Sequence, residues 1–216
     1  MAKKLKIRKI DAAVSDAAEV AAALDNAGIG FEKIETVNWD EFPYRPEVKF
    51  RIAHTGDAIL INYRCSEEAV RAVAAGDNGA VWEDSCVEFF ASFDGKHYYN
   101  IECNCLGTIL CAVGADRNER TPADKTVLEG VKRYSSLTGK MPSDGKGPVD
   151  WEVSLIVPAT TYFGAGINDF TGRKATANFY KCGDKLPTPH FLSWNPIATA
   201  SPDFHRPEFF APIEFE

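Results

Sequence analysis

VWEDSCVEFFASFDGKHYYNIECN, residues 81–104, is the stretch that decides how this chain is expected to fold. It is rich in aromatic and apolar residues, as the strands of a packed sheet are, and Asp94-Gly95 marks a turn in its middle. It also places Glu88 and Glu102 inside the two strands. A charged side chain is costly to bury, so the positions of these carboxylates indicate which face of the hairpin lies away from the core.

Two registers are possible for this hairpin. A two-residue turn at Asp94-Gly95 would place Cys86 opposite Cys103 and Glu88 opposite Ile101, so that both faces would mix charged and apolar side chains. A loop of three residues, with the glycine in the left-handed conformation, shifts the pairing by one residue and separates the two kinds of side chain. Burial of apolar surface, worth roughly 25 cal/mol per Å², favours the second register.

The favoured register gives the hairpin one apolar face and one polar face. The apolar face consists of Val87, Phe89, Ala91, His97, Tyr99, Ile101 and Cys103. The polar and aromatic face consists of Glu88, Phe90, Tyr98, Asn100, Glu102 and Asn104. We expect the apolar face to form a layer of the core and the polar face to be the outer side of a sheet, with Glu88 and Glu102 as diagonal neighbours.

Most of the other segments also have the pattern of strands. Residues 48–55 and 57–64 flank a turn at Thr55-Gly56, and residues 175–182 alternate between apolar and polar side chains. Residues 149–157 alternate cleanly before Pro158 ends the strand. The apolar side chains of this last segment share one face: Val149, Trp151, Val153, Leu155 and Val157.

Two segments have the pattern of helices. Apolar residues at helical spacing from Val14 to Leu24 predict one helix, with Ser15 as its cap and Gly28 where it ends. A second, short helix is predicted at 66–76. Because strands dominate, the predicted fold class is all-β: an antiparallel, jelly-roll-like β-sandwich with one or two short peripheral helices.

Length and charge limit the possible functions. The chain has 216 residues, and we expect 1–216 to form a single domain, because the polar segment 139–148 has the composition of a loop rather than a linker. The net charge of -7 and the pI of about 5.2 argue against a nucleic-acid partner. No apolar run approaches the ~20 residues of a membrane span, and no apolar segment follows the basic N-terminal residues. We therefore expect no membrane partner and a cytoplasmic location, unless a leader has been removed.

The cysteines show neither a disulfide framework nor a metal-binding spacing. We expect six reduced, mostly buried thiols: Cys65, Cys86, Cys103, Cys105, Cys111 and Cys182. The closely spaced Cys103, Cys105 and Cys111 lack the pairing of structural zinc sites, so no metal is expected there. The common hydrolase motifs G-x-S-x-G and H-E-x-x-H are absent from the sequence.

The polar face of the hairpin admits two interpretations. Many antiparallel sheets have a solvated side on which Glu or Asn is ordinary. Alternatively, the face binds a ligand: Tyr98 offers a flat apolar surface, and the carboxylates and amides offer hydrogen-bond partners, a mixture that suits sugars. The same pair, Glu88 and Glu102, could also serve as the two carboxylates of a glycosidase, which lie about 5.5 Å or 6.5–9.5 Å apart.

Several motifs resemble those of a known family. Trp82 followed by EDSCVEFF, and then YYNIECNCLGTIL at 98–110, are similar to the W-x-D-S-V-E-x-F and Y-x-x-x-x-N-x-x-G patterns of family 9 carbohydrate-binding modules. The C-terminal run from 177 to 210, which contains S-W-x-P and a closing P-x-x-F, resembles the end of that family. The resemblance extends from about Trp39 to the C-terminus and is strongest to single-domain bacterial members. It implies a β-sandwich related to DOMON domains.

The resemblance also implies a set of ligand-binding residues. Known members hold the reducing end of a sugar between two aromatic side chains, which would correspond here to Trp82 and Phe204, the latter in place of an expected tryptophan. Glu88 matches the family's glutamate, and Asn178 matches a polar residue of the late strand. Glu102 stands where known sugar binders have arginine, which reverses a charge. Asn100, Arg117, His205 and Arg206 are further candidates by polarity and location.

We therefore expect a non-catalytic carbohydrate-binding domain with an aromatic-flanked polar pocket. Its expected partner is a mono- or oligosaccharide, with neutral sugars favoured because of the carboxylates. Two alternatives remain open: a glycoside hydrolase that uses Glu88 and Glu102, and a sandwich whose sugar site has decayed and that binds a partner. No catalytic residue, metal or cofactor is expected, although structural calcium, with ligands that cannot be placed, is compatible with the family.

Overall fold

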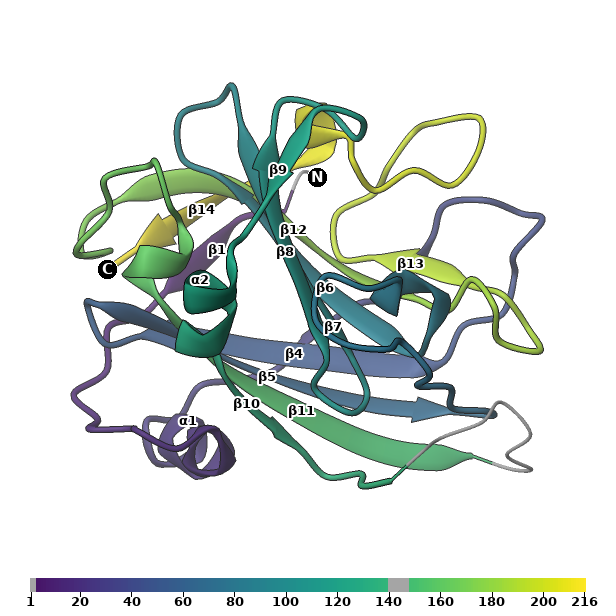
Figure 1. The fold of residues 1–216 in the computed structure, drawn as a ribbon, viewed down its shortest axis with the longest axis horizontal. Helices are drawn as coiled ribbons and strands as arrows, with labels where there is room; N and C mark the ends of the chain where they lie inside the picture. The colour runs from purple at the N-terminus through teal and green to yellow at the C-terminus, as the bar shows by residue number, and fades with distance from the viewer. Residues whose placement is uncertain (1–2, 140–147) are drawn as a thin grey trace.

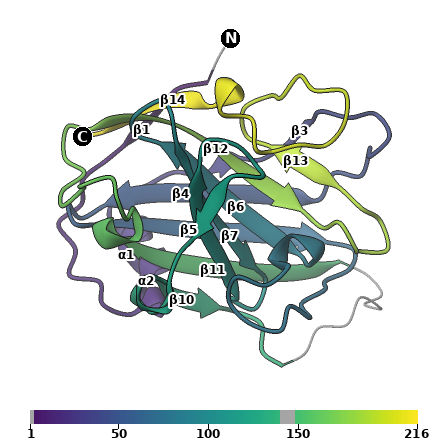
Figure 2. The same cartoon turned by 45° about the horizontal axis from the view of Figure 1, so that its top comes forward.

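The protein is a sandwich of two β-sheets, seen in a computed structural model that describes residues 3–139 and 148–216 (Figures 1 and 2). The predicted loop at 139–148 therefore lies almost wholly outside the described residues. In Figure 1 the strands of one sheet run across the view and those of the other cross them steeply. The predicted all-β sandwich is confirmed.

The larger sheet contains the hairpin. Its strands lie in the order β1 (Leu5–Ile7), β14 (Ala211–Phe215), β12 (Lys174–Cys182), β6 (Cys86–Ser92), β7 (Tyr98–Asn104), β8 (Ile109–Gly114) and β9 (Arg120–Pro122), with β13 (Phe191–Ser193) beside β12 and β3 (Thr36–Val37) beside β13. Only β1 and β14 pair in parallel among the described strands of this sheet.

The smaller sheet faces the apolar side of the hairpin. Its order is β10 (Lys132–Ser135), β11 (Val149–Pro158), β5 (Ala58–Glu67), β4 (Glu47–His54) and β2 (Glu32–Lys33). Two α-helices, α1 (Val20–Asn26) and α2 (Lys125–Gly130), lie at the periphery, together with the 3-10 helices η1 (Ala17–Glu19), η2 (Val81–Glu83), η3 (Ala159–Thr161) and η4 (Pro207–Phe209).

The core between the sheets is built from the alternating side chains that the sequence indicates. The ring of Phe179 in β12 stacks on Phe50 in β4, with centroids 3.7 Å apart, and on Phe89 in β6, at 4.9 Å. The predicted apolar face of β11 lies in this core: Trp151 is buried, as are the three residues that alternate after it, while Val149 packs against the edge. Face-to-face packing of alternating strands thus accounts for most of the apolar burial.

A second apolar layer covers the other side of the larger sheet. It joins Phe90, Tyr98 and Tyr180 on the sheet to Trp39 and Phe204 in the loops that cross it. Tyr180 stacks on Phe204 with centroids 4.2 Å apart and donates its hydroxyl to the Phe204 carbonyl at 3.1 Å. Of the two interpretations of this face, the solvated outer surface is wrong, because aromatic side chains on the sheet and in the loops bury one another.

The hairpin shows the predicted separation of faces, but its loop is longer than predicted. Glu88 pairs directly with Glu102 across β6 and β7, and Phe89 pairs with Ile101. The loop spans five residues, 93–97, so the two carboxylates are direct rather than diagonal neighbours. Gly95 has the expected left-handed conformation, with φ of 70°. His97, expected on the apolar face, is exposed in the loop and hydrogen-bonds to Asp94.

One of the two predicted helices is present. The first begins with η1, capped by Asp16 rather than Ser15, continues as α1 and ends before Gly28, whose φ is 64°. The helix predicted at 66–76 is wrong, because its first residues complete β5 and the backbone N–H groups of Val73 and Ala74 donate to the Asp84 carboxylate instead of to a helix. The described residues contain no helix long and apolar enough to cross a membrane.

Candidate functional site

The centre of the candidate site is the pair of carboxylates on β6 and β7. Glu88 is 3% exposed and Glu102 is 2% exposed, so neither meets bulk water freely. The Cys182 thiol donates to Glu88 Oε1 at 3.1 Å, and the Asn100 amide donates to Glu102 Oε1 at 3.1 Å. Glu102 Oε2 has no hydrogen-bond partner within the described residues. The pair is therefore buried and incompletely satisfied.

Burial sets the protonation of this pair. It raises the pKa of Glu88 well above its ordinary value, and the neighbouring Glu102 adds to that rise. It also raises the pKa of Glu102 to about 7, although the Arg120 guanidinium, 3.8 Å away, opposes the change. Two adjacent carboxylates in a region of low dielectric cannot both ionise without a large cost. The pair therefore retains a proton at neutral pH.

The carboxylates lie at the bottom of a pocket of about 300 Å³. The predicted residues Trp82, Glu88, Glu102, Arg117, Phe204 and His205 all line it. Sequence reasoning did not single out the other lining residues: Asn118, Arg120, Cys182, Asp184, Phe191, Pro202 and Asp203. The structure thus brings together residues from the hairpin, from the loop before β9 and from the C-terminal loops.

Three predicted residues do not line the pocket. The Asn178 side chain is fully buried and ties β12 to the segment after β13, accepting from Asn195 N at 2.8 Å and donating to Asn195 O at 2.9 Å. Asn100 lies behind Glu102 and orients its carboxylate. Arg206 pairs instead with Glu208. Asn178 is therefore not on the floor of the pocket, contrary to the expectation.

The two predicted aromatic residues differ in their surroundings. Trp82, on η2, is half-buried at the pocket wall and keeps part of its side chain open. Phe204 is 8% exposed, because one face of its ring stacks on Tyr180 and Phe191 meets it edge-on at 6.3 Å. Phe204 is thus both a core residue and part of the wall, and Trp82 offers the freer surface.

The position of Trp82 is fixed by polar residues of the same motif. The buried Asp84 carboxylate accepts hydrogen bonds from the backbone N–H groups of Val73 and Ala74 and from the Asn104 amide, each at 2.9–3.0 Å. The Arg71 guanidinium lies 3.5 Å away and balances its charge. These contacts attach η2 to the sheet and explain why polar residues directly follow Trp82.

The pKa values of two further lining residues, Asp184 and His205, are shifted in opposite directions. Burial raises the pKa of Asp184 to about 6. Burial, with the positive charges of Arg120 and Arg117, lowers the pKa of His205 to about 3, so this imidazole is neutral at pH 7. Its Nδ1 lies 2.9 Å from the Tyr98 hydroxyl. Because Asp203 contributes another carboxylate, the lining has more acidic than basic groups.

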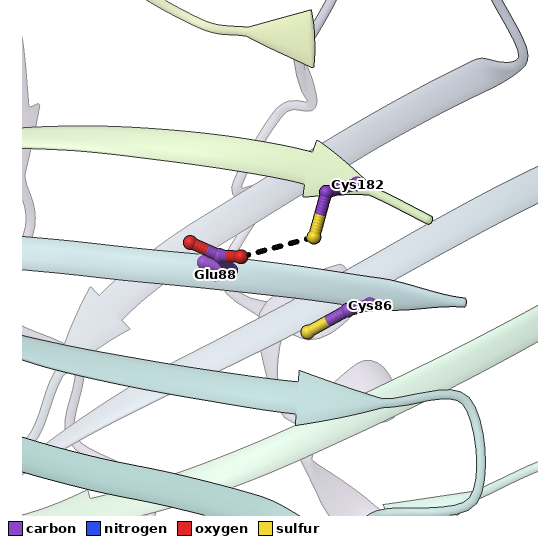
Figure 3. Close-up of side chains that lie close together, drawn as sticks. All are labelled: Cys86, Glu88 and Cys182. Carbon is purple, nitrogen blue, oxygen red and sulfur yellow. Dashed lines mark hydrogen bonds between the residues drawn. The ribbon is translucent and has the colours of Figure 1, made fainter. Parts of the chain in front are cut away.

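One group of side chains on the described part of the chain has the composition of a metal site. The ligand atoms of Cys86, Glu88 and Cys182 lie within 4.8 Å of one another, and all three residues are buried (Figure 3). The other four cysteines lie in the core between the sheets, and all six are free and buried. Structural calcium, which is compatible with the family, stays a prediction.

Comparison with known proteins assigns the chain to a family. A structure from Bacteroides uniformis ATCC 8492, described as that of a candidate carbohydrate-binding protein, is 47% identical, covers 100% of each chain and has a TM-score of 0.96. Two structures of a family 9 carbohydrate-binding module from Caldicellulosiruptor kristjanssonii share the fold. The complex with cellotriose has 12% identity, a TM-score of 0.57 and coverage of 99% of this chain and 94% of that one. The complex with glucose has 13% identity, a TM-score of 0.56 and coverage of 99% of this chain and 96% of that one.

Among curated proteins no match is found. The profile of carbohydrate-binding family 9 matches residues 18–215, nearly the whole chain, in agreement with the motifs around Trp82 and Glu88. The chain belongs to carbohydrate-binding family 9.

Proposed function

We propose that this protein is a non-catalytic carbohydrate-binding module that takes a neutral mono- or oligosaccharide into the pocket beside Trp82. The observation that carries the proposal is a half-buried tryptophan next to a floor of buried, incompletely satisfied polar groups, in a chain of this family. A volume of about 300 Å³ is at the lower end for small-molecule pockets and suits one sugar ring better than a long chain.

The chemistry of the pocket matches the two kinds of surface on a sugar. Trp82 offers an apolar surface for a ring face. Glu102 Oε2 and Arg120 Nη1 are buried and have no hydrogen-bond partner within the described residues, so a ligand hydroxyl would satisfy an acceptor and a donor at once. Buried polar groups left unpaired cost roughly 1–3 kcal/mol each, and a bound hydroxyl would recover part of that cost.

Arg120 compensates for the replacement of the family's arginine by Glu102. Glu102 stands where known sugar binders have arginine, but Arg120 on β9 brings a guanidinium within 3.8 Å of its carboxylate. The pocket therefore still presents a cation close to that position, supplied by another strand. We expect the ligand to interact with the Glu102–Arg120 pair rather than with an isolated carboxylate.

The balance of charge favours neutral sugars. The lining contains four carboxyl groups and two guanidinium groups, and His205 is neutral. With one proton retained by the Glu88–Glu102 pair, three negative charges still face two positive ones. A uronic acid would add a further negative charge to this surface. Stacking and a few hydrogen bonds must outweigh desolvation and the lost freedom of the ligand, so we expect dissociation constants on the order of micromolar to millimolar.

The arrangement of the carboxylates does not favour a glycosidase. The two groups of such an enzyme flank the scissile bond, one on each side. Glu88 and Glu102 project from the same face of the sheet as direct cross-strand neighbours. We therefore expect no hydrolysis of aryl glycosides; a bell-shaped dependence of rate on pH that disappears in Glu88→Gln would instead indicate an enzyme.

Calorimetric titration with glucose, cellotriose and glucuronic acid tests the proposal. We expect the neutral sugars to bind more tightly, and Trp82→Ala to weaken their binding by roughly tenfold, as loss of an aromatic contact of about 1 kcal/mol or more implies. Tyr134→Ala is a matched control, because this exposed aromatic lies on β10, far from the pocket lining. Equal binding by Trp82→Ala and wild type, or tighter binding of glucuronic acid, would contradict the proposed site. Failure of every sugar to bind would favour a partner-binding domain.

A further inference from the structure

A group of three ligand-type side chains lies at the edge of the pocket where β6 and β12 meet. Cys86 pairs directly with Cys182 across these two strands, and Glu88 follows Cys86 by two residues, so it lies on the same face of the sheet. Figure 3 shows the two thiols and the carboxylate converging, with the Cys182 thiol 3.1 Å from Glu88 Oε1. The sheet register thus brings the three groups together.

These two cysteines are in a different environment from the other four. Cys65, Cys103, Cys105 and Cys111 belong to the core between the sheets, where they pack as small apolar side chains. Cys86 and Cys182 face the opposite side of the larger sheet, toward the pocket and the buried carboxylates. Cys86 and Cys182 also pack in the second apolar layer, but that packing alone does not require their juxtaposition with the Glu88 carboxylate.

The ligand set and its spacing suit a thiophilic divalent cation. Zinc binds cysteine sulfur at about 2.3 Å and carboxylate oxygen at about 2.0–2.2 Å, so neighbouring ligands of a tetrahedral ion lie roughly 3.5–3.8 Å apart. The three ligand atoms already lie within 4.8 Å of one another, and Cys182 Sγ is 3.1 Å from Glu88 Oε1, so side-chain shifts of about an ångström bring them to these separations. Calcium and magnesium prefer oxygen ligands and do not match two sulfur atoms.

The surroundings leave one coordination position open. Glu88 and Cys182 line the pocket, whereas Cys86 does not, so an ion among the three would have one side toward the pocket. Two thiolates and a carboxylate carry three negative charges, which the ion reduces to one. The positive charges of Lys181 and Arg120 act on this group, Lys181 on Cys86 and Arg120 on Glu88.

We propose that Cys86, Glu88 and Cys182 bind one zinc ion at the floor of the pocket, with a water molecule from the pocket as the fourth ligand. Binding requires both thiols and the Glu88 carboxyl to be deprotonated: the thiol protons go to solvent, and the proton held by the Glu88–Glu102 pair stays on Glu102 or is also released. This inference goes beyond the sugar site and uses Glu88 in a second role. Three protein ligands and one open position form an arrangement that zinc adopts in proteins.

Metal titration of the whole chain, first stripped with a chelator, tests the proposal. With zinc we expect one ion per chain, release of protons and a higher melting temperature. Cadmium should produce a thiolate charge-transfer band, and cobalt the intense visible bands of a tetrahedral site with sulfur ligands. These spectra report on the wild type and require no variant.

Variants locate the site. Loss of a hydrogen-bond partner to a metal ligand costs 10–100-fold in affinity, and loss of a ligand costs more, so Cys86→Ala and Cys182→Ala should each weaken zinc binding by more than about 100-fold. Cys111→Ala is the matched control: it also removes a buried strand thiol, but one in the core between the sheets, and it should bind zinc as wild type does. Absence of binding by wild type, cadmium or cobalt spectra without sulfur ligation, or equal zinc affinity in the Cys86 variant would overturn the proposal.

Discussion

Replacement of Glu102 by glutamine should stabilise the protein at high pH and leave its stability nearly unchanged at low pH. In the folded state burial raises the pKa of Glu102 to about 7, compared with 4.5 for an ordinary glutamate. Glutamine keeps the shape and the oxygen that accepts from Asn100 at 3.1 Å, but it never ionises. Glu102→Gln therefore represents the protonated form at every pH.

The sign and size of the effect follow from proton linkage. Below pH 4.5 the carboxyl is protonated in both the folded and unfolded states, so wild type and variant should be about equally stable. Between pH 4.5 and about 7 the unfolded state ionises first, and wild type loses stability as the pH rises. At about 1.4 kcal/mol per pH unit the full difference is on the order of 3 kcal/mol. The favourable effect of Arg120 on the ionised form is already contained in that pKa.

Thermal and urea unfolding at several pH values between 4 and 8 measure this difference. For a domain of this size, 3 kcal/mol corresponds to roughly 6–12 °C in melting temperature. Glu129→Gln is a matched control: it makes the same chemical change at an exposed position of α2, and its difference from wild type should not follow this profile. A Glu102→Gln variant whose difference from wild type is the same at pH 4.5 and pH 8 would refute the reasoning.

Three further predictions concern other buried groups. Asp84→Ala should lower the free energy of unfolding by about 3–5 kcal/mol in urea titrations. The change leaves the backbone N–H groups of Val73 and Ala74 without an acceptor and Arg71 without its charge partner. A loss below about 1 kcal/mol would contradict this role. Glu67→Gln should lower the free energy of unfolding by a similar 3–5 kcal/mol, because Lys181 is fully buried 2.9 Å from Glu67 and would lose its charge partner. As a control, Glu83→Gln breaks the more exposed Lys185–Glu83 pair and should lower it by less than about 1 kcal/mol. The six buried thiols should react slowly with a thiol reagent in the folded protein, and all six should react in denaturant without reductant. A count of four or fewer reactive thiols in denaturant would indicate a disulfide.

The hairpin shows which part of the fold the sequence can predict. In the structure Phe89 and Ile101 share one face and Glu88 and Glu102 share the other. Because side chains alternate along a strand, a change of loop length by an even number of residues leaves these faces unchanged. The predicted three-residue loop and the observed five-residue loop differ by two residues and give the same faces. Loop length was wrong because the turn signal at Asp94-Gly95 does not specify how far the strands continue.

Burial of the polar face could not be predicted in the same way. Strand periodicity indicates which residues share a face, but not which distant loop covers that face. Here the segment around Phe204 returns over the sheet and stacks on Tyr180, which encloses the carboxylates. For the same reason sequence reasoning missed Arg120 and Asp184, which reach the pocket from β9 and from the connection that follows β12. A polar loop immediately before β9 was the only sequence signal for Arg120, and it resembles any solvated loop.

The motif residues of the family divide into two groups, and this division explains why the fold was easier to predict than the ligand. Asp84 and Asn104 are satisfied by backbone and side-chain partners of the protein itself, so they hold Trp82 and the strand ends in place regardless of what binds. Glu102 lines the pocket and keeps a buried oxygen without a hydrogen-bond partner among the described residues, so its chemistry depends on its neighbours. A charge reversal at such a position can be offset by a cation from another strand, as Arg120 does here, without disturbing the sheet. Similarity in the first group therefore specifies the sandwich, whereas ligand preference depends on the second group and must be measured.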